Sequence, residues 1–159
     1  MRTLILLAAV TAIAGCANAP SLPGAPPAAS QPEAPVRTDS LPPQRLAPGQ
    51  CGVFLFELRE PNAFVFFEDE TARRVKIVHD GRIIETGVTP QSGAFVPGDQ
   101  IRRVYLAQAD NLTFTLTGRV GEETGSGLRV EDALLKTRFL DGSEIVRPLG
   151  GVRRCEDGR

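Results

Sequence analysis

Apolar and polar residues alternate along the chain from Cys51 onward. The clearest example is the segment 112–117, Leu-Thr-Phe-Thr-Leu-Thr, in which every second residue is apolar. Because successive side chains of a β-strand point to opposite faces, this pattern predicts a strand with one buried face and one face in water. Similar segments recur with turn residues between them, which is typical of an all-β domain. The candidate strands are 53–58, 63–68, 73–79, 82–87, 101–107, 112–117, 128–140, 143–147 and 151–154.

The connections between these segments favour antiparallel neighbours. Asp80-Gly81 and Asp141-Gly142 each separate two apolar runs, and Asp-Gly suits the positive φ angles of a two-residue type I′ hairpin turn. The Gly-rich stretch 121–127 predicts a longer hairpin loop. Segment 128–140 is long for one strand and Glu131-Asp132 interrupts its alternation, so we expect either a β-bulge or a short helical turn at 130–134.

No part of this region shows a capped apolar stripe with helical period, and the connections are too short for crossover helices. The pattern therefore predicts an all-β domain at 51–159, a small and mostly antiparallel barrel or sandwich of about eight strands.

The first 15 residues have the form of an export signal. Arg2 is followed by an apolar run from Leu4 to Ala14, which is too short to span about 30 Å of hydrocarbon as a helix. Ile13-Ala14-Gly15-Cys16 resembles the lipobox of bacterial lipoproteins. The resemblance implies cleavage before Cys16 and acylation of that cysteine with chains such as palmitate.

Several acyl chains would hold the protein on a membrane far more firmly than one myristoyl chain does. Ala17 follows the cysteine in place of the Asp that commonly retains such lipoproteins at the inner membrane. The resemblance thus implies an outer-membrane anchor, with the protein facing the periplasm. The alternative is an ordinary secretory signal cut after Ala19, which would release a soluble protein.

Residues 16–50 predict a linker without a core of their own. They contain 9 Pro and 7 Ala among 35 residues, and each proline removes a backbone donor and fixes φ. We expect a passive spacer between the membrane and the domain; the alternative is a docking peptide for a proline-recognising partner.

The chain has three cysteines. If Cys16 carries lipid, Cys51 and Cys155 remain as a pair near the two ends of the domain, and an oxidising compartment favours a disulfide between them over two free thiols.

Charge and composition leave little room for catalysis. The chain has 18 basic and 19 acidic residues, which does not favour nucleic acid as a partner. A lone histidine, His79, lacks a nucleophile motif and a metal-ligating set, so we expect no enzyme activity, no metal and no cofactor. The run Glu68-Asp69-Glu70 reads as a solvated turn.

Two further features bear on binding. Five of the eight Phe lie at 54–67, and adjacent Phe66 and Phe67 must face opposite sides of a strand. One side therefore needs a cover: a second sheet, the linker or a partner. Consecutive residues of a strand face opposite ways, so at least one Arg of each pair at 73–74, 102–103 and 153–154 is expected in water. We expect these pairs to form solvated surface; the alternative is that the other member of a pair contacts a carboxylate.

A loop between two candidate strands reads Ser92-Gly93-Ala94-Phe95. It is similar to the Ser-Gly-x-x-Tyr loop of the membrane-bound inhibitors of C-type lysozyme, which are lipoproteins with a small antiparallel barrel. Phe95 stands where that family has Tyr. The resemblance implies a loop 88–100 that enters the lysozyme cleft, with Ser92, Gly93 and Phe95 as contacts.

The sequence thus predicts a non-enzymatic envelope lipoprotein that presents a β domain to the periplasm for binding or structural interaction, with a possible protein partner. The lysozyme inhibitor is the alternative, and an enzyme ranks third.

Overall fold

The computed structural model describes residues 38–89 and 95–157. It confirms an all-β domain of eight strands and one 3₁₀ turn, η1 (Gln108–Asp110). The strands are β1 (Cys51–Glu57), β2 (Phe64–Asp69), β3 (Arg74–His79), β4 (Arg82–Gly87), β5 (Gln100–Ala107), β6 (Leu112–Thr124), β7 (Gly127–Arg138) and β8 (Glu144–Cys155).

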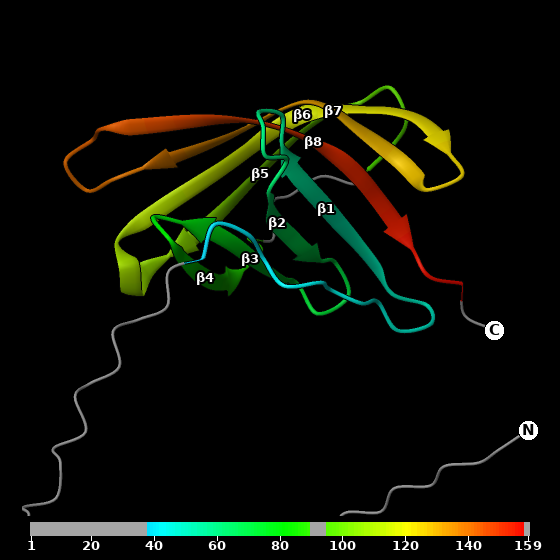
Figure 1. The fold of residues 1–159 in the computed structure, drawn as a ribbon, viewed down its shortest axis with the longest axis horizontal. Coiled ribbons are helices and arrows are strands. Elements are labelled where there is room, and N and C mark those ends of the chain that lie inside the picture. The colour runs from blue at the N-terminus through cyan, green and yellow to red at the C-terminus, as the bar shows by residue number, and fades with distance from the viewer. Residues whose placement is uncertain (1–37, 90–94, 158–159) are drawn as a thin grey trace, which may run out of the picture. The chain divides into compact units, whose positions relative to one another are not determined.

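The strands form one antiparallel sheet that curls into a half-barrel, in the order β4-β3-β2-β1-β8-β7-β6-β5 (Figure 1). The first and last strands of the chain are therefore neighbours in the middle of the sheet. The edge strands β4 and β5 approach each other through one isolated bridge between Val88 and Tyr105. The Thr86 hydroxyl donates to the Leu106 carbonyl oxygen at 2.7 Å beside that bridge.

The seam between β1 and β8 is closed covalently. Cys51 lies directly opposite Cys155 in the register, and the two form a disulfide with 3.9 Å between their α-carbons. Gly151 allows the two strands to approach closely, because an added Cβ would lie 1.9 Å from the Phe54 carbonyl oxygen. The predicted pairing of the two cysteines is confirmed.

Two predicted boundaries are wrong. Segments 143–147 and 151–154 belong to one strand, β8. Pro148 does not break it, because on the β1 side only its carbonyl oxygen is used, by the Leu58 N–H at 3.4 Å. The predicted loop 121–127 is mostly strand, since β6 and β7 stay paired as far as Thr124 and Gly127.

The two Asp-Gly turns differ. Asp80 and Gly81 have φ angles of 47° and 68°, as a type I′ turn requires. The second connection has a three-residue loop instead: Gly142 has φ 84°, and the Phe139 N–H donates to the Ser143 carbonyl oxygen at 3.0 Å. The Asp141 carboxylate, which accepts hydrogen bonds from Ser143, favours this wider turn. Both connections join antiparallel neighbours, as predicted.

The irregular region at 130–134 is a β-bulge. Pairing of β7 with β8 skips from Val130 to Ala133, and Asp132 adopts φ 50°. The structure thus decides between the two alternatives that the sequence left open.

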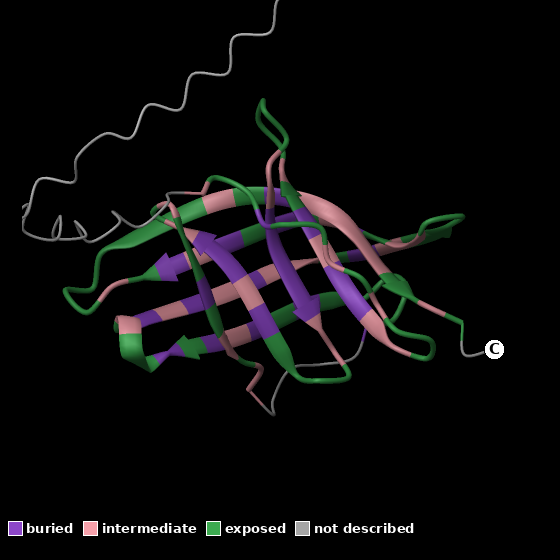
Figure 2. Ribbon diagram, turned by 60° about the horizontal axis from the view of Figure 1, so that its bottom comes forward, coloured by how far each residue is buried: buried purple, intermediate pink, exposed green. Residues whose placement is uncertain are grey.

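Residues 38–50, which the sequence assigns to the linker, contact the sheet; we call them the strap. The Leu41 N–H donates to the Phe64 carbonyl oxygen at 2.6 Å, and the Lys76 ammonium donates to Gln44. Leu41 is buried and Leu46 packs against the core. Leu46 of the strap and Phe67 lie 3.0 and 3.1 Å from the position that a Cβ on Gly52 would occupy, so the strap helps to cover Phe67, which is 6% exposed. Buried, half-buried and exposed residues alternate along several strands of the sheet (Figure 2).

Candidate functional site

A cleft of about 730 Å³ opens at one end of the half-barrel, and we call it the end cleft. It lies where β1 ends, β2 begins, the β3–β4 turn folds back and the β7–β8 hairpin extends. Its walls come from the strap, the β1–β2 loop and these strand ends. The lining residues are Asp39, Glu57, Arg59, Glu60, Pro61, Ala63, Val65, Val78, His79, Asp80, Gly81, Phe139, Ile145 and Arg147.

Glu57 and Arg147 form the charged centre of the end cleft. The Arg59 Nε donates to Glu57 at 2.8 Å, and Arg147 contacts the same carboxylate at 3.5 Å. A second Arg147 nitrogen donates to the Val78 carbonyl oxygen at 2.7 Å, so this side chain spans from β8 to β3. The hydrogen bond from Arg59 lowers the pKa of Glu57, and burial lowers the pKa of Arg147.

His79 also lines the end cleft. Its ring packs against Phe114 and Phe139, with 5.8 and 5.6 Å between ring centroids. Burial lowers its pKa below the ordinary value, and the positive charge of Arg147 lowers it further. His79 is therefore a neutral side chain at neutral pH, available as one donor and one acceptor.

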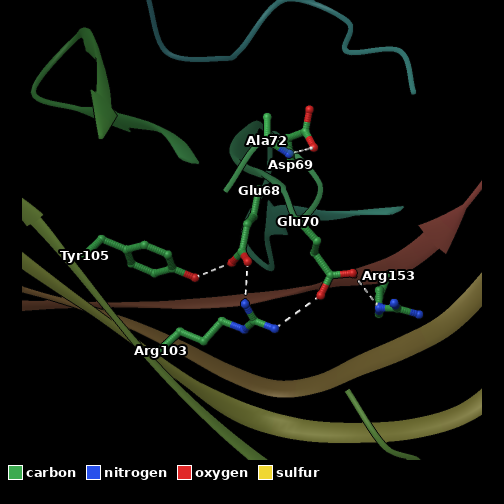
Figure 3. Close-up of polar contacts among 7 residues, drawn as sticks. All are labelled: Glu68, Asp69, Glu70, Ala72, Arg103, Tyr105 and Arg153. Atoms are coloured by element: carbon green, nitrogen blue, oxygen red, sulfur yellow. Dashed lines mark hydrogen bonds and ion pairs between the residues drawn. The ribbon is translucent and has the colours of Figure 1, made fainter. Parts of the chain in front are cut away.

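The opposite end of the half-barrel holds a second polar cluster (Figure 3). Arg103 on β5 donates to Glu68 on β2, and the Tyr105 hydroxyl donates to the other oxygen of that carboxylate at 2.6 Å. Arg103 also contacts Glu70 at 3.2 Å, and the Arg153 Nε donates to Glu70 at 2.8 Å. The cluster thus joins β2, β5 and β8 across the interior.

The prediction of a solvated turn at 68–70 is wrong for Glu68, whose side chain is only 1% exposed. Alternation contained the signal, because Glu68 is two residues after the buried Phe66 and faces the same side. Burial raises the pKa of Glu68, while Arg103 and the Tyr105 hydroxyl oppose the rise. Burial, and then the carboxylate of Glu68, raise the pKa of Tyr105.

The predicted contact loop is described only in part. Ser92 and Gly93 lie outside the described residues. Phe95 is 8% exposed, and its ring lies under the guanidinium of Arg103, 4.4 Å from the ring centroid. Val96 is 47% exposed. Phe95 therefore faces the interior cluster, whereas the lysozyme-inhibitor resemblance implies an outward aromatic residue.

The structure also shows where two of the Arg pairs and several Phe residues lie. Arg103 and Arg153 are the partly or fully buried members of two Arg pairs and contact carboxylates, while Arg102 and Arg154 are exposed. The Phe residues divide between the interior, where Phe66 meets Tyr105, and the outer face, where Phe54 contacts Phe64 and Phe67. Cys16 lies outside the described residues.

The sequence did not predict the end cleft as a site. Glu57 comes from β1, whereas Ile145 and Arg147 come from β8, and no local motif indicates that these two distant segments converge.

No group of three metal-ligating side chains occurs within residues 38–89 and 95–157. In the same ranges, no helix has the length and apolar character that a membrane span requires. No family model, curated protein or solved structure matches the chain.

Proposed function

We propose that this chain is a non-enzymatic envelope lipoprotein whose β domain binds another molecule through the end cleft. In this proposal, lipid at Cys16 anchors the protein in the outer membrane, and the domain faces the periplasm. The end cleft is the observation that carries the binding role.

Two properties support the end cleft as a binding site, and a comparison with the opposite end of the half-barrel favours it further. Its volume of about 730 Å³ falls in the range of ligand pockets, roughly 300 to 1,000 Å³. Its wall combines apolar residues with charged groups held at fixed positions, such as Arg147 between Glu57 and the Val78 carbonyl. The polar cluster at the opposite end is more enclosed, because Glu68 and Arg103 are only 1% and 6% exposed.

The anchor is tested by Cys16→Ala. We expect the variant to lose lipid modification and to leave the membrane fraction, because the lipobox resemblance places the acyl chains on this sulfur. The measurement is fractionation with mass spectrometry of the N-terminal peptide. Processing and fractionation like those of the wild type would contradict the proposal.

The binding role is tested in cells with a photo-crosslinking amino acid at Ile145, which lines the end cleft. The matched control carries the same group at Ile83, which is also exposed but lies on β4 outside the cleft. We expect a discrete adduct at 145 that is missing at 83. Identical patterns at the two positions would contradict a binding role for the end cleft.

The lysozyme-inhibitor alternative gains no support from the buried Phe95. A lysozyme assay with the whole chain tests it directly, since that function requires inhibition at micromolar protein.

A further inference from the structure

Strand β8 has an open edge beside the end cleft. It runs from Glu144 to Cys155, but β1 pairs with it only from Leu149 onward. Among the described residues, no strand pairs with residues 144–148 on that side, while β7 pairs on the other. Exposed strand edges are sites at which another chain can add a strand.

The backbone of this edge points toward the opening. The Pro148 carbonyl oxygen accepts from Leu58 on the β1 side, and alternate residues of a strand direct their N–H and C=O groups to the same side. Val146 and Glu144 therefore present their backbone groups to the open side. An incoming strand would continue the line of β1 beyond Glu57.

Apolar side chains gather around the same edge. Nine large apolar residues are exposed in the described part of the chain. Six of them belong to β1, β7, β8 or the loops that leave these strands at the end cleft. These six are Phe56, Leu58, Leu134, Leu140, Ile145 and Val146.

The two faces of the edge differ in character. Val146 and Leu58 lie on the outer face, where Leu58 covers Gly150. The inner face borders the end cleft, where four carboxylates (Asp39, Glu57, Glu60 and Asp80) outnumber the two guanidinium groups of Arg59 and Arg147. A strand at this edge would therefore place apolar side chains outward and basic side chains inward.

The geometry points to an extended segment of another protein, with alternating apolar and basic residues, that adds to the open edge of β8 and fills the end cleft. This inference rests on the proposed binding function and names its ligand class. A second copy of the chain is disfavoured as the occupant, because it would bring the same excess of carboxylates against this one. Long basic side chains can also pack their methylene groups on Ile145 and Phe139.

The test uses the whole oxidised chain and the synthetic peptide Lys-Val-Lys-Val-Lys-Val, with binding followed by fluorescence anisotropy. Two control peptides carry Glu in place of Lys, or N-methyl groups on alternate backbone nitrogens. We expect the Lys peptide to bind. The Glu peptide should bind more weakly by about tenfold or more, and so should the methylated peptide, because one loses the charge match and the other the strand hydrogen bonds.

Val146→Pro removes the backbone N–H that residue 146 presents to the open side of β8, and it leaves the hydrogen bonds between β8 and β7 in place. It should weaken binding of the Lys peptide by about tenfold. Val146→Thr is the matched control, since it keeps the N–H and the branched side chain. If the proline variant fails to fold, Asp39→Lys with Glu60→Lys gives a second reading, because both positions are exposed. This double variant should abolish the preference for the Lys peptide.

Equal binding of the methylated peptide would overturn strand addition. Self-association that Val146→Pro abolishes would assign the edge to a second copy instead, and no binding of any peptide would also overturn the inference. An adduct at Ile145 in cells without peptide binding would leave the proposed function in place and refute only this ligand class. Failure of both experiments would refute both.

Discussion

Arg103 and Glu68 are charged residues enclosed by apolar strands, and their mutual contact offsets the cost of removing them from water. Their exposed fractions are 6% and 1%, so solvent screens their contact little. Removing one member leaves the other charge buried without its main partner, which is more costly than removing both.

We expect Arg103→Met to lower the free energy of unfolding by roughly 3 to 5 kcal/mol, because Glu68 then stays buried without its guanidinium. Adding Glu68→Gln should recover at least ~1 kcal/mol, since a neutral amide needs no counter-charge. Urea denaturation measures both. The exposed neighbour serves as control, and Arg102→Met should change stability by less than about 0.5 kcal/mol. Equal losses at 102 and 103 would refute the buried pair.

His79 makes stability depend on pH. Burial lowers its folded pKa below the ordinary value of 6.5, so the unfolded chain binds more protons than the folded one just below that pH. Stability is then full above pH 6.5 and decreases as the pH falls through the folded pKa. As the pH falls below 6.5, stability should decrease less steeply in His79→Gln than in the wild type.

The pH series compares urea unfolding of the two proteins under identical buffers. The raised pKa of Glu68 has the opposite effect, because it makes stability decrease as the pH rises. Both proteins contain Glu68, so its contribution cancels in the comparison. Parallel slopes would show that His79 titrates alike in the folded and unfolded chain.

At the residue scale, the sequence was a better guide to the kinds of contact in the domain than to the residues that make each contact. Alternation predicted that at least one Arg of each pair would lie in water and left a contact with a carboxylate as the alternative for the other. It could not identify Glu68 as the partner of Arg103, because their strands β2 and β5 are not neighbours in the sheet. The end cleft could not be predicted either, because its residues come from segments whose proximity the sequence does not indicate.

At the scale of elements, the strap is the segment whose role differs most from its composition. Proline-rich sequence favours extended backbone, but an extended chain can still bury individual side chains. Leu41 is 4% exposed and its backbone is bound to β2, so the strap acts as a cover of the sheet.

Leu41→Ala should therefore destabilise the domain by about 2 kcal/mol or more, through loss of buried apolar contact and an incompletely filled space. Leu140→Ala is the control, because that side chain is 80% exposed and should change little. Thermal unfolding of the whole chain gives the comparison. Similar melting temperatures for the two variants would show that the strap does not contribute to stability.

The predicted strand 112–117, in which apolar residues and Thr alternate without interruption, agrees with the first half of β6, and the predicted bounds of β4 agree with the observed ones at both ends. Predictions failed where glycine or proline interrupts a paired strand, at 121–127 and Pro148. Tertiary pairing outweighs local preference at these positions.

At the scale of the whole molecule, the disulfide at the seam joins residues 104 apart in sequence. In the chain-entropy model a loop of that size limits the stabilisation to roughly 4.7 kcal/mol, and real bridges usually deliver less. We expect Cys155→Ser to lower the free energy of unfolding by about 2 to 4 kcal/mol, because the unfolded chain gains freedom while the strand register remains.

The measurement is urea unfolding in a Cys16→Ala background, which removes the third thiol. Cys51→Ser, Cys155→Ser and the reduced parent should agree with one another, since each lacks the same bond. If Cys155→Ser unfolded with the same midpoint urea concentration as the oxidised parent, the disulfide would contribute nothing to stability.

The seam also sets the order in which the sheet can be completed. On either side of it, β1 to β4 and β5 to β8 are runs of consecutive strands joined to their chain neighbours, so each half can form by closing short loops. Only the pairing of β1 with β8 requires both ends of the domain, which makes it the slowest contact to reach by loop closure. A chain that lacks its last strand would leave β1 as an unprotected edge in the middle of the future sheet, where chains aggregate by pairing with one another. Arrival of β8 therefore covers the edge of β1 and removes this route to misassembly.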